Sequence, residues 1–309
     1  MTGGRPAGRA GGDLRNYALV TGAYWADTVT DGALRILVLF YFHELGYGAL
    51  AVASLFLFYE VFGVVTNLVG GWLAARLGLR ATLVMGLTTQ LVALAMLAAA
   101  PDGLLVVGYV MAAQALSGIA KDLTKMSSKS AVKLVAPADS PGALYRWVAV
   151  LTGSKNALKG VGFFAGGLLL TTVGFRAGLL VLIALVAAAL AVVLAMMRGD
   201  LGAADAGARF RHMFSQRRAV NLLAGARVAL FASRDVWFVV GLPVYLREVL
   251  GWGFWEVGAF LAAWVIGYGA VQAAAPGIVG RGRRSARREP AGGTVLGLAL
   301  VLAAAPAGS

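Results

Sequence analysis

Two lysines lie four residues apart in one of the most apolar parts of the chain, Lys155 and Lys159 in the stretch LTGSKNALKGVGFFAGG (151–167). A charged side chain at the centre of a membrane-spanning helix costs about 2.5 to 3.5 kcal/mol. On a helix this spacing puts both ammonium groups on one side, where they repel each other. Neither lysine has an acidic residue within four positions. The counter-charge is therefore either a carboxylate on another helix, such as Asp31 or Asp235, or a bound anion such as phosphate.

Other charged residues in apolar segments are candidates for the same site. Ionisable groups within membrane spans mostly face the interior of a helix bundle, where they bind a ligand, carry a proton or form ion pairs. The candidate substrate-binding residues are Lys155, Lys159, Arg35, Arg234, Lys121 and Arg227. The candidates for proton coupling or ion pairing are Asp27, Asp31, Glu60, Asp122 and Asp235. Local pairs are open alternatives, because Arg35 lies one helical turn from Asp31 and Asp122 adjoins Lys121.

The composition indicates what kind of segment holds these charges. The chain has 309 residues, of which 60% are hydrophobic and 13% charged, whereas a soluble domain carries about 25% charged residues. This predicts an all-α polytopic membrane protein. Because the chain has no cysteine, disulfides, thiolate metal sites and a cysteine nucleophile are excluded. Its two histidines, His43 and His212, lie at or beyond span ends, so we expect neither an enzyme nor a metal or other cofactor.

Apolar segments of about 20 residues, the length that crosses a bilayer, predict the membrane spans. They lie near 17–42, 50–74, 81–100, 104–124, 146–171, 176–197, 219–246 and 254–277. The longer connections, 125–145, 198–218 and 278–292, are polar and basic. A ninth span begins near 293 and has only about 13 residues before the final PAGS, so the chain is expected to be incomplete.

The basic residues predict the orientation of these spans. With the N-terminus in the cytoplasm, 20 of the 27 Lys and Arg residues fall on the cytoplasmic side, and only Arg176 and Arg247 on the other. This bias predicts a multi-pass protein of the cytoplasmic (inner) membrane with a cytoplasmic N-terminus. The net charge of +13 is thereby explained by loops beside the lipid bilayer, and no nucleic-acid partner is expected.

An internal repeat indicates how the spans are grouped. The segment YFHELGYGALAVASLF (41–56) resembles YLREVLGWGFWEVGAFL (245–261) after a one-residue insertion, and the same offset aligns Asp31 with Asp235. Two related halves are typical of secondary transporters. We therefore predict a six-helix bundle at 1–197, a basic cytoplasmic loop at 198–218, and an incomplete second half at 219–309 with two complete spans and the start of a third.

The connection after the second span resembles a known signature. The segment GGWLAARLGLRATL (70–83) is similar to the loop motif between the second and third helices of the major facilitator superfamily. Its Gly71, Arg76, Gly78 and Arg80 fit, whereas Ala75 stands where an acidic residue is usual. The segment GFFAGG (162–167) resembles the glycine-rich antiporter motif of the fifth helix, with Phe163 at the proline position.

Longer segments resemble one branch of that superfamily, the organoarsenical-efflux (ArsJ) family. They are NYALVTGAYWADTVTDGALRILVLFYFHELGY, FLFYEVFGVVTNLVGGWLAARLGLRATL, LSGIAKDLTKMSSKSAVKLV, LTGSKNALKGVGFFAGGLLL and ASRDVWFVVGLPVYL. The resemblance implies a bundle of the major facilitator type that exports 1-arseno-3-phosphoglycerate by alternating access and confers arsenate resistance. It also implies a functional partner, a glyceraldehyde-3-phosphate dehydrogenase that makes this substrate, without a stable complex.

An exporter of another organic anion, or of drugs, is the alternative. Export of cationic drugs would favour an acidic pocket without counter-charges, and the two locally unpaired lysines argue against it. The absence of cysteine also suits an arsenate ester better than arsenite, because arsenite seeks soft thiolate ligands.

Overall fold

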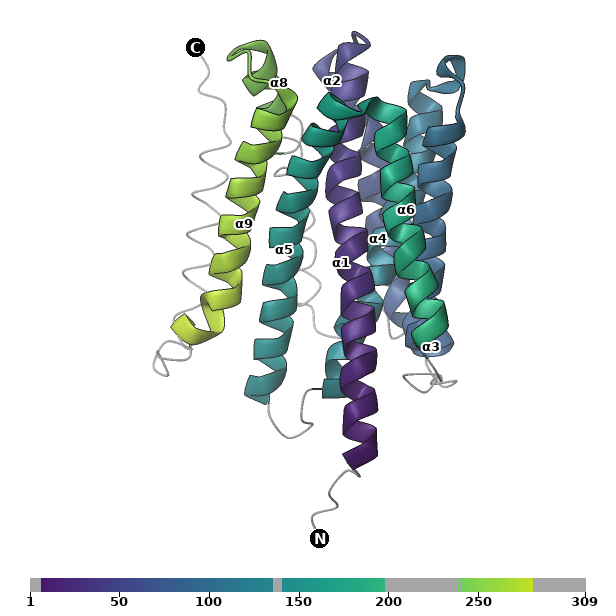
Figure 1. The fold of residues 1–309 in the computed structure, drawn as a ribbon, viewed down its shortest axis with the longest axis vertical. Coiled ribbons are helices and arrows are strands. Elements are labelled where there is room, and N and C mark those ends of the chain that lie inside the picture. The colour runs from purple at the N-terminus through teal and green to yellow at the C-terminus, as the bar shows by residue number, and fades with distance from the viewer. Residues whose placement is uncertain (1–6, 136–140, 198–237, 239–240, 280–309) are drawn as a thin grey trace.

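The computed structural model describes residues 7–135, 141–197, 238 and 241–279. Within these ranges the secondary structure is helical and contains no strand, which confirms the predicted all-α class (Figure 1). The helices are α1 (Ala7–Glu44), α2 (Ala49–Leu55), α3 (Leu57–Ala99), α4 (Val107–Val135), α5 (Pro141–Thr172), α6 (Gly174–Met196), α8 (Leu242–Glu248) and α9 (Phe254–Val279), with a short 3-10 turn at Asp102–Leu104.

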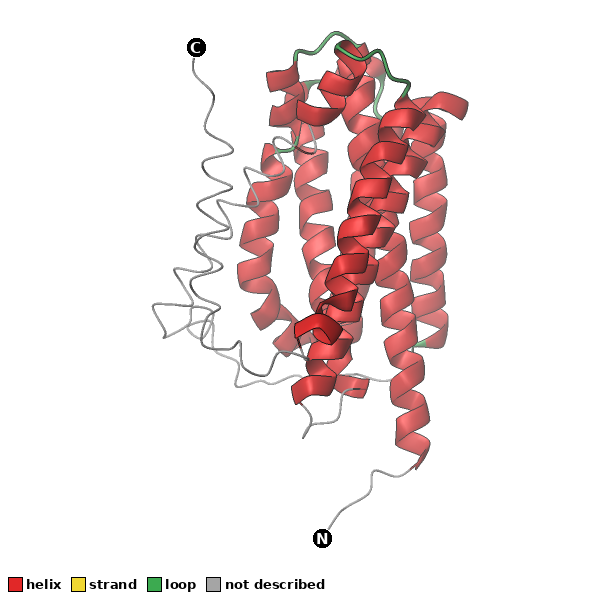
Figure 2. Ribbon diagram, turned by 90° about the vertical axis from the view of Figure 1, so that its left-hand side faces the viewer, coloured by secondary structure: helices red, strands yellow, loops and turns green. Residues whose placement is uncertain are grey.

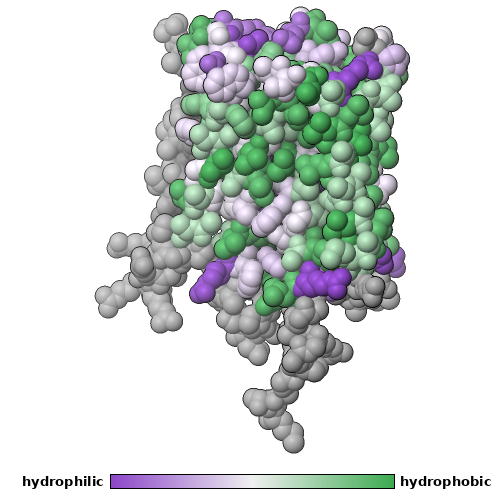
Figure 3. All heavy atoms as spheres, viewed as in Figure 1, coloured by the Kyte–Doolittle hydropathy of each residue, from purple (hydrophilic) through white to green (hydrophobic). Residues whose placement is uncertain are grey.

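The long helices lie side by side (Figures 1 and 2), and α1 lies between α5 and α6 in the view of Figure 1. Helix α1 packs against α4, α5 and α6, while α3 packs mainly on α4, and α5 on α9. Apolar side chains cover most of the middle of the face in Figure 3, and hydrophilic side chains gather at its two ends. Three segments among the described residues are long and apolar enough to cross a membrane: Arg76–Ala99, Gly174–Met196 and Phe254–Val271.

The helices extend further than the predicted spans. We expected a connection at 125–145, but α4 continues to Val135 and α5 already begins at Pro141. The prediction was wrong because the lysines at 121, 125, 129 and 133 keep the four-residue helical spacing beyond the apolar part,. Proline at the first turn of α5 is well tolerated, since that position needs no backbone N–H donor.

A single turn residue separates the second and third predicted spans. Gly78, inside α3, has φ 79° and ψ 170°, a conformation that glycine adopts without the clash of a Cβ atom,. The expected connection at 75–80 is thus a kink rather than a loop. The predicted central loop at 198–218 and the ninth span lie outside the described residues, as does nearly all of 278–292.

Glycines let α5 approach both of its neighbours. Gly153, Gly160 and Gly167 recur every seven residues and so lie on one face of the helix,. A Cβ atom at Gly160 would lie 2.8 Å from the carbonyl oxygen of Ala262 on α9, and one at Gly166 would lie 3.0 Å from the Cα of Ala33 on α1. Such close approach of backbones is typical of helices that associate in membranes.

Arginines bind the carbonyl groups left without partners at the C-terminal end of α6. Arg15 of α1 donates to the oxygen of Met196 at 3.0 Å, and Arg80 of α3 donates to that of Leu194 at 3.4 Å. Positive charge at this end also interacts favourably with the helix dipole. These bonds connect three helices at the lower end of the bundle, where the N-terminus lies (Figure 1).

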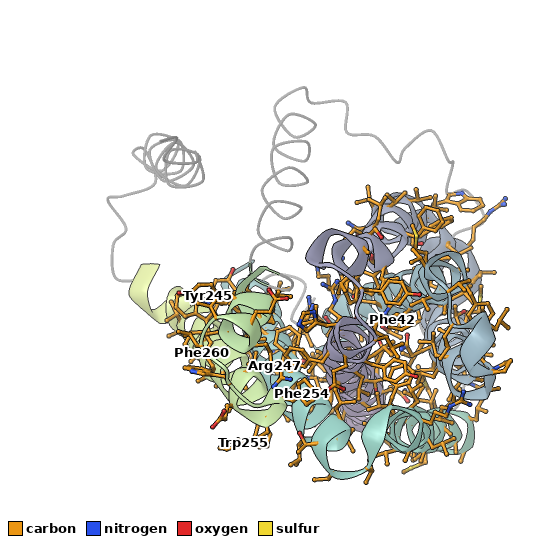
Figure 4. The ribbon with its side chains drawn as sticks, turned by 90° about the horizontal axis from the view of Figure 1, so that it is seen from above. Phe42, Tyr245, Arg247, Phe254, Trp255 and Phe260 are labelled. Atoms are coloured by element: carbon orange, nitrogen blue, oxygen red, sulfur yellow. The ribbon has the colours of Figure 1, made fainter. Side chains whose placement is uncertain are left out.

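The upper end of the bundle joins α8 and α9 to α1. His43 Nε2 lies 3.6 Å from Glu248 Oε1, and the Phe40 and Phe254 rings are 4.9 Å apart. The Arg247 guanidinium lies 3.9 Å from the centre of the Phe254 ring. Seen from above, Arg247 and Phe254 are on the side toward α1 and α5 (Figure 4).

Candidate functional site

A connected set of polar side chains lies inside the bundle, and we call it the interior cluster. Its members come from four helices: Asp27, Asp31 and Arg35 of α1, Tyr59 and Glu60 of α3, Lys121, Asp122, Thr124 and Lys125 of α4, and Lys155 and Lys159 of α5. Charges so placed interact more strongly than in water, because the surrounding protein and lipid are weakly polarisable. The ionisable groups of the cluster therefore act strongly on one another.

Asp31 is the centre of the first ion pair. Its carboxylate is 5% exposed, accepts a hydrogen bond from the Tyr59 hydroxyl and lies 3.4 Å from Lys159 Nζ. The pair is possible because α1 and α5 nearly touch here: a Cβ atom at Gly32 would lie 2.6 Å from the backbone oxygen of Lys159. The alternative that a lysine of α5 pairs with Asp31 thus holds for Lys159.

Arg35 pairs with Glu60 rather than with Asp31. Its Nη2 lies 2.5 Å from Glu60 Oε1, although the arginine side chain is only 2% exposed. The guanidinium also lies 4.1 Å from the centre of the Tyr59 ring, an arrangement in which the negative face of the ring attracts the cation,. The intrahelical pair that the sequence left open is therefore replaced by one between α1 and α3.

The lysines of α4 differ in their surroundings. Lys125 Nζ lies 2.5 Å from the buried Asp122 carboxylate, three residues earlier on the same helix. Lys121 Nζ instead lies 3.9 Å from the centre of the Tyr59 ring. It forms no ion pair with any carboxylate in the part of the chain that the structure describes.

Lys155 also lacks a carboxylate partner within the described ranges. It is half-buried, and the charged groups that act on it include Lys159, Lys121 and Lys125, which are all cations, and Asp31. The two lysines of α5 thus differ: Lys159 is ion-paired with Asp31, whereas the charged groups that act on Lys155 are mainly cations.

Asp27 is the most deeply buried carboxylate residue of the cluster, with 1% of its surface exposed. Its Oδ2 accepts a hydrogen bond from Thr124 Oγ1 at 2.6 Å. Its Oδ1 has no hydrogen-bond partner among the described residues.

The remaining predicted residues lie elsewhere. Arg227, Arg234 and Asp235 fall outside the described residues. The loop-motif residues Gly71, Arg76, Gly78 and Arg80 belong to α3. Arg76 lies about 24 Å along the helix from Glu60 at 1.5 Å per residue, and its guanidinium is 5.2 Å from the centre of the Trp72 ring. The motif is therefore separate from the interior cluster.

Two hydroxyl residues of the cluster were not anticipated from the sequence. Tyr59 touches Asp31, Arg35 and Lys121, and Thr124 binds Asp27. Tyrosine and threonine are both common in apolar spans, so their residue types did not indicate a role. The one signal in the sequence was that Tyr59 adjoins the charged residue Glu60. No group of three or more histidine and acidic side chains that could hold a metal ion occurs among the described residues.

Long apolar helices that enclose ion pairs and uncompensated cations define a multi-pass membrane protein of the transporter class. The chain belongs to the Major Facilitator Superfamily, whose family model matches residues 20–309. The predicted superfamily is therefore confirmed. Membership makes this chain a secondary transporter of a small organic substrate, and not an enzyme.

One of the similar solved structures supports the same fold. A crystal structure of a POT family transporter in complex with a thioalcohol-conjugated peptide has a TM-score of 0.61 and 15% identity, covering 89% of this chain and 71% of that one. Two crystal structures of the peptide transporter POT in complex with sulfate, one of a mutant, have TM-scores of 0.49 with 19% and 18% identity. They cover 78% and 79% of this chain, which spans 48% of their length. No curated protein matches the chain.

Proposed function

We propose that this protein exports an anionic organic ester across the cytoplasmic membrane by alternating access, with its N-terminus in the cytoplasm. The proposed substrate is 1-arseno-3-phosphoglycerate, which a glyceraldehyde-3-phosphate dehydrogenase would supply without forming a stable complex, and the resulting activity is arsenate resistance. The observation that carries the anionic substrate is the pair of lysines, Lys121 and Lys155, that lack a carboxylate partner among the described residues.

The argument rests on the charges that remain after pairing. The ion pairs of the cluster are Asp31–Lys159, Glu60–Arg35 and Asp122–Lys125. The ring of Tyr59 stabilises Lys121 only in part, since a cation–π contact contributes about 0.5 to 2 kcal/mol,. Lys155 has no such contact in the described region. Lys121 and Lys155 are thus the lysines of the cluster available to an anion, whereas Asp31, Glu60 and Asp122 are already ion-paired.

The ion pairs also separate the lysines that could bind the substrate directly from those that are already paired. Lys155 and Lys121 are proposed as direct ligands of the phosphate or arsenate end of the substrate. Lys159 and Arg35, which are ion-paired with Asp31 and Glu60, remain candidates as well. The arsenate ester itself is favoured by the resemblance to the organoarsenical-efflux family and by the absence of cysteine,.

An exporter of another organic anion fits the same two lysines. A cationic drug does not, because it would meet uncompensated positive charge. The two candidate substrates predict different phenotypes. If the protein exports the arsenate ester, it should confer arsenate resistance that depends on co-expressed dehydrogenase. If it exports another organic anion, it should confer no arsenate resistance.

The test is an arsenate-resistance assay in a sensitive host that co-expresses the dehydrogenase, with the wild type, Lys155→Gln and a matched control. Lys129→Gln suits as control, because Lys129 is an exposed lysine on α4. We expect Lys155→Gln to export the arsenate ester at least tenfold more slowly than the wild type, while its insertion into the membrane is unchanged. Lys129→Gln should behave as the wild type. Unchanged export by Lys155→Gln would refute its role as a ligand.

A further inference from the structure

Asp27 has an environment that the other carboxylates of the cluster do not share. Asp31, Glu60 and Asp122 each have a cation within ion-pair distance. Asp27 has none among the described residues, and only the Thr124 hydroxyl binds it. An ionised carboxylate buried without a counter-charge is strongly unfavourable, and such a group takes up a proton instead.

We propose that Asp27 is the proton-binding residue of the interior cluster, and that its protonation strengthens the binding of the anionic substrate. The inference rests on the proposed anion site at Lys121 and Lys155. Protonated Asp27 leaves the excess positive charge of that site intact. Ionised Asp27 would cancel part of it and would also repel the anion.

The neighbours of Asp27 support this direction of coupling. The titratable groups that act on it are Tyr24 and Asp31 of α1 and Lys121 and Asp122 of α4. On α5, Lys155 and Lys159 act on Asp31. Asp31 and Asp122 are already ion-paired, so Lys121 is the cation for which an ionised Asp27 and a bound anion would compete. By thermodynamic reciprocity, a bound anion must then raise the proton affinity of Asp27 by the same factor.

The size of the effect follows from Coulomb's law. One charge about 10 Å from a singly charged anion, at the effective dielectric constant of about 20 that suits protein sites, changes the affinity roughly tenfold, and the effect on the binding free energy of a dianion is twice as large. Proton and anion therefore bind together, the opposite of the competition that a simple exchange of a proton for the substrate requires.

The experiment measures binding of sulfate, which stays dianionic across the range used, to the purified protein between pH 6 and pH 9. We expect the affinity of the wild type for sulfate to fall at least tenfold as the pH rises. Asp27→Asn mimics the neutral acid and can still accept the Thr124 hydrogen bond. Its affinity should therefore fall less with rising pH than that of the wild type. Glu44→Gln, which changes an exposed carboxylate of the same helix, should behave as the wild type.

A second readout separates Asp27 from the lysines, whose own titration would also weaken anion binding at high pH. When sulfate is added to the weakly buffered wild-type protein, the protein should take up protons from the solution. The Asp27→Asn variant should take up at least threefold fewer. If Asp27→Asn does not fold, Thr124→Val serves instead: it removes the hydrogen bond to Oδ2 and should move the fall in affinity to higher pH.

The outcomes are distinct. Equal pH dependence and equal proton uptake in the wild type and Asp27→Asn would overturn the assignment of Asp27 while leaving the anion site standing. An absence of sulfate binding at every pH in the wild type would instead contradict the proposed anion site, and the coupling with it.

Discussion

Replacing Gly162 by alanine should destabilise the bundle at the contact between α1 and α5. A Cβ atom built at Gly162 would press against the backbone oxygen of Val29, and it would lie 3.0 Å from Gly32 Cα and 3.1 Å from Ala33 N. All three atoms belong to the backbone, so no side-chain rotation can relieve the overlap. The two helices must separate.

The expected magnitude combines two opposing effects. Overpacking a tight contact costs about 1 to 3 kcal/mol, and a contact made only of backbone atoms belongs at the upper end. Alanine recovers about 1 kcal/mol of helix propensity relative to glycine. The free energy of unfolding should therefore fall by about 2 kcal/mol, up to about a thirtyfold change in the ratio of folded to unfolded protein.

The assay is reversible unfolding from a mild detergent into a denaturing one, followed by far-UV circular dichroism. Gly22→Ala on α1 is the matched control, because a Cβ atom there meets nothing within 4 Å. It should be neutral or stabilise by up to about 1 kcal/mol. If Gly162→Ala proves as stable as Gly22→Ala, the reasoning about close helix approach at this level is refuted.

Two further predictions concern the ends of the bundle. Because the chain has no cysteine, single cysteines can report its orientation: in intact cells an impermeant thiol reagent should label Leu45→Cys, at the upper end, and leave Leu14→Cys, near the N-terminus, unlabelled. The reverse pattern would invert the predicted topology. His43→Gln and Glu248→Gln should show a coupling of at most about 1 kcal/mol in a double-mutant cycle of unfolding, because Glu248 is 56% exposed,. A coupling well above 1 kcal/mol would contradict the view of this contact as an exposed, screened pair.

The sequence predicts the fold class well because lipid imposes a simple rule. A segment must be apolar for about 20 residues to cross the bilayer, and such segments are easy to find in a chain with so few charges. The same rule fails beyond the lipid. Helix α4 continues past Lys125 and Lys129 to Val135, since hydropathy reports the thickness of the membrane whereas helix length depends on backbone hydrogen bonds and spacing.

The interior cluster is predictable as a list of residues, but its pairs are not. Sequence proximity suggested that Arg35 would bind Asp31, one turn away, yet Arg35 binds Glu60. Asp31 is occupied by Lys159 and by the Tyr59 hydroxyl. The ion pairs depend on side chains from three helices. A single sequence does not indicate which helices pack against each other, so it does not predict the pairs.

The different roles of Lys155 and Lys159 follow from the stagger of α1 and α5. These helices run in the same direction, since Gly162 meets Val29 and Gly166 meets Ala33. Stepping back four residues on each helix moves from Lys159 and Asp31 to Lys155 and Asp27, so α1 brings a second carboxylate to the level of the second lysine. That carboxylate binds Thr124 on α4 instead. Lys155 thus has no carboxylate partner among the described residues, although Asp27 lies four residues before Asp31 on the facing helix. This arrangement is costly for stability alone, and it is the one expected where a lysine must hold an anion and the acid must hold a proton.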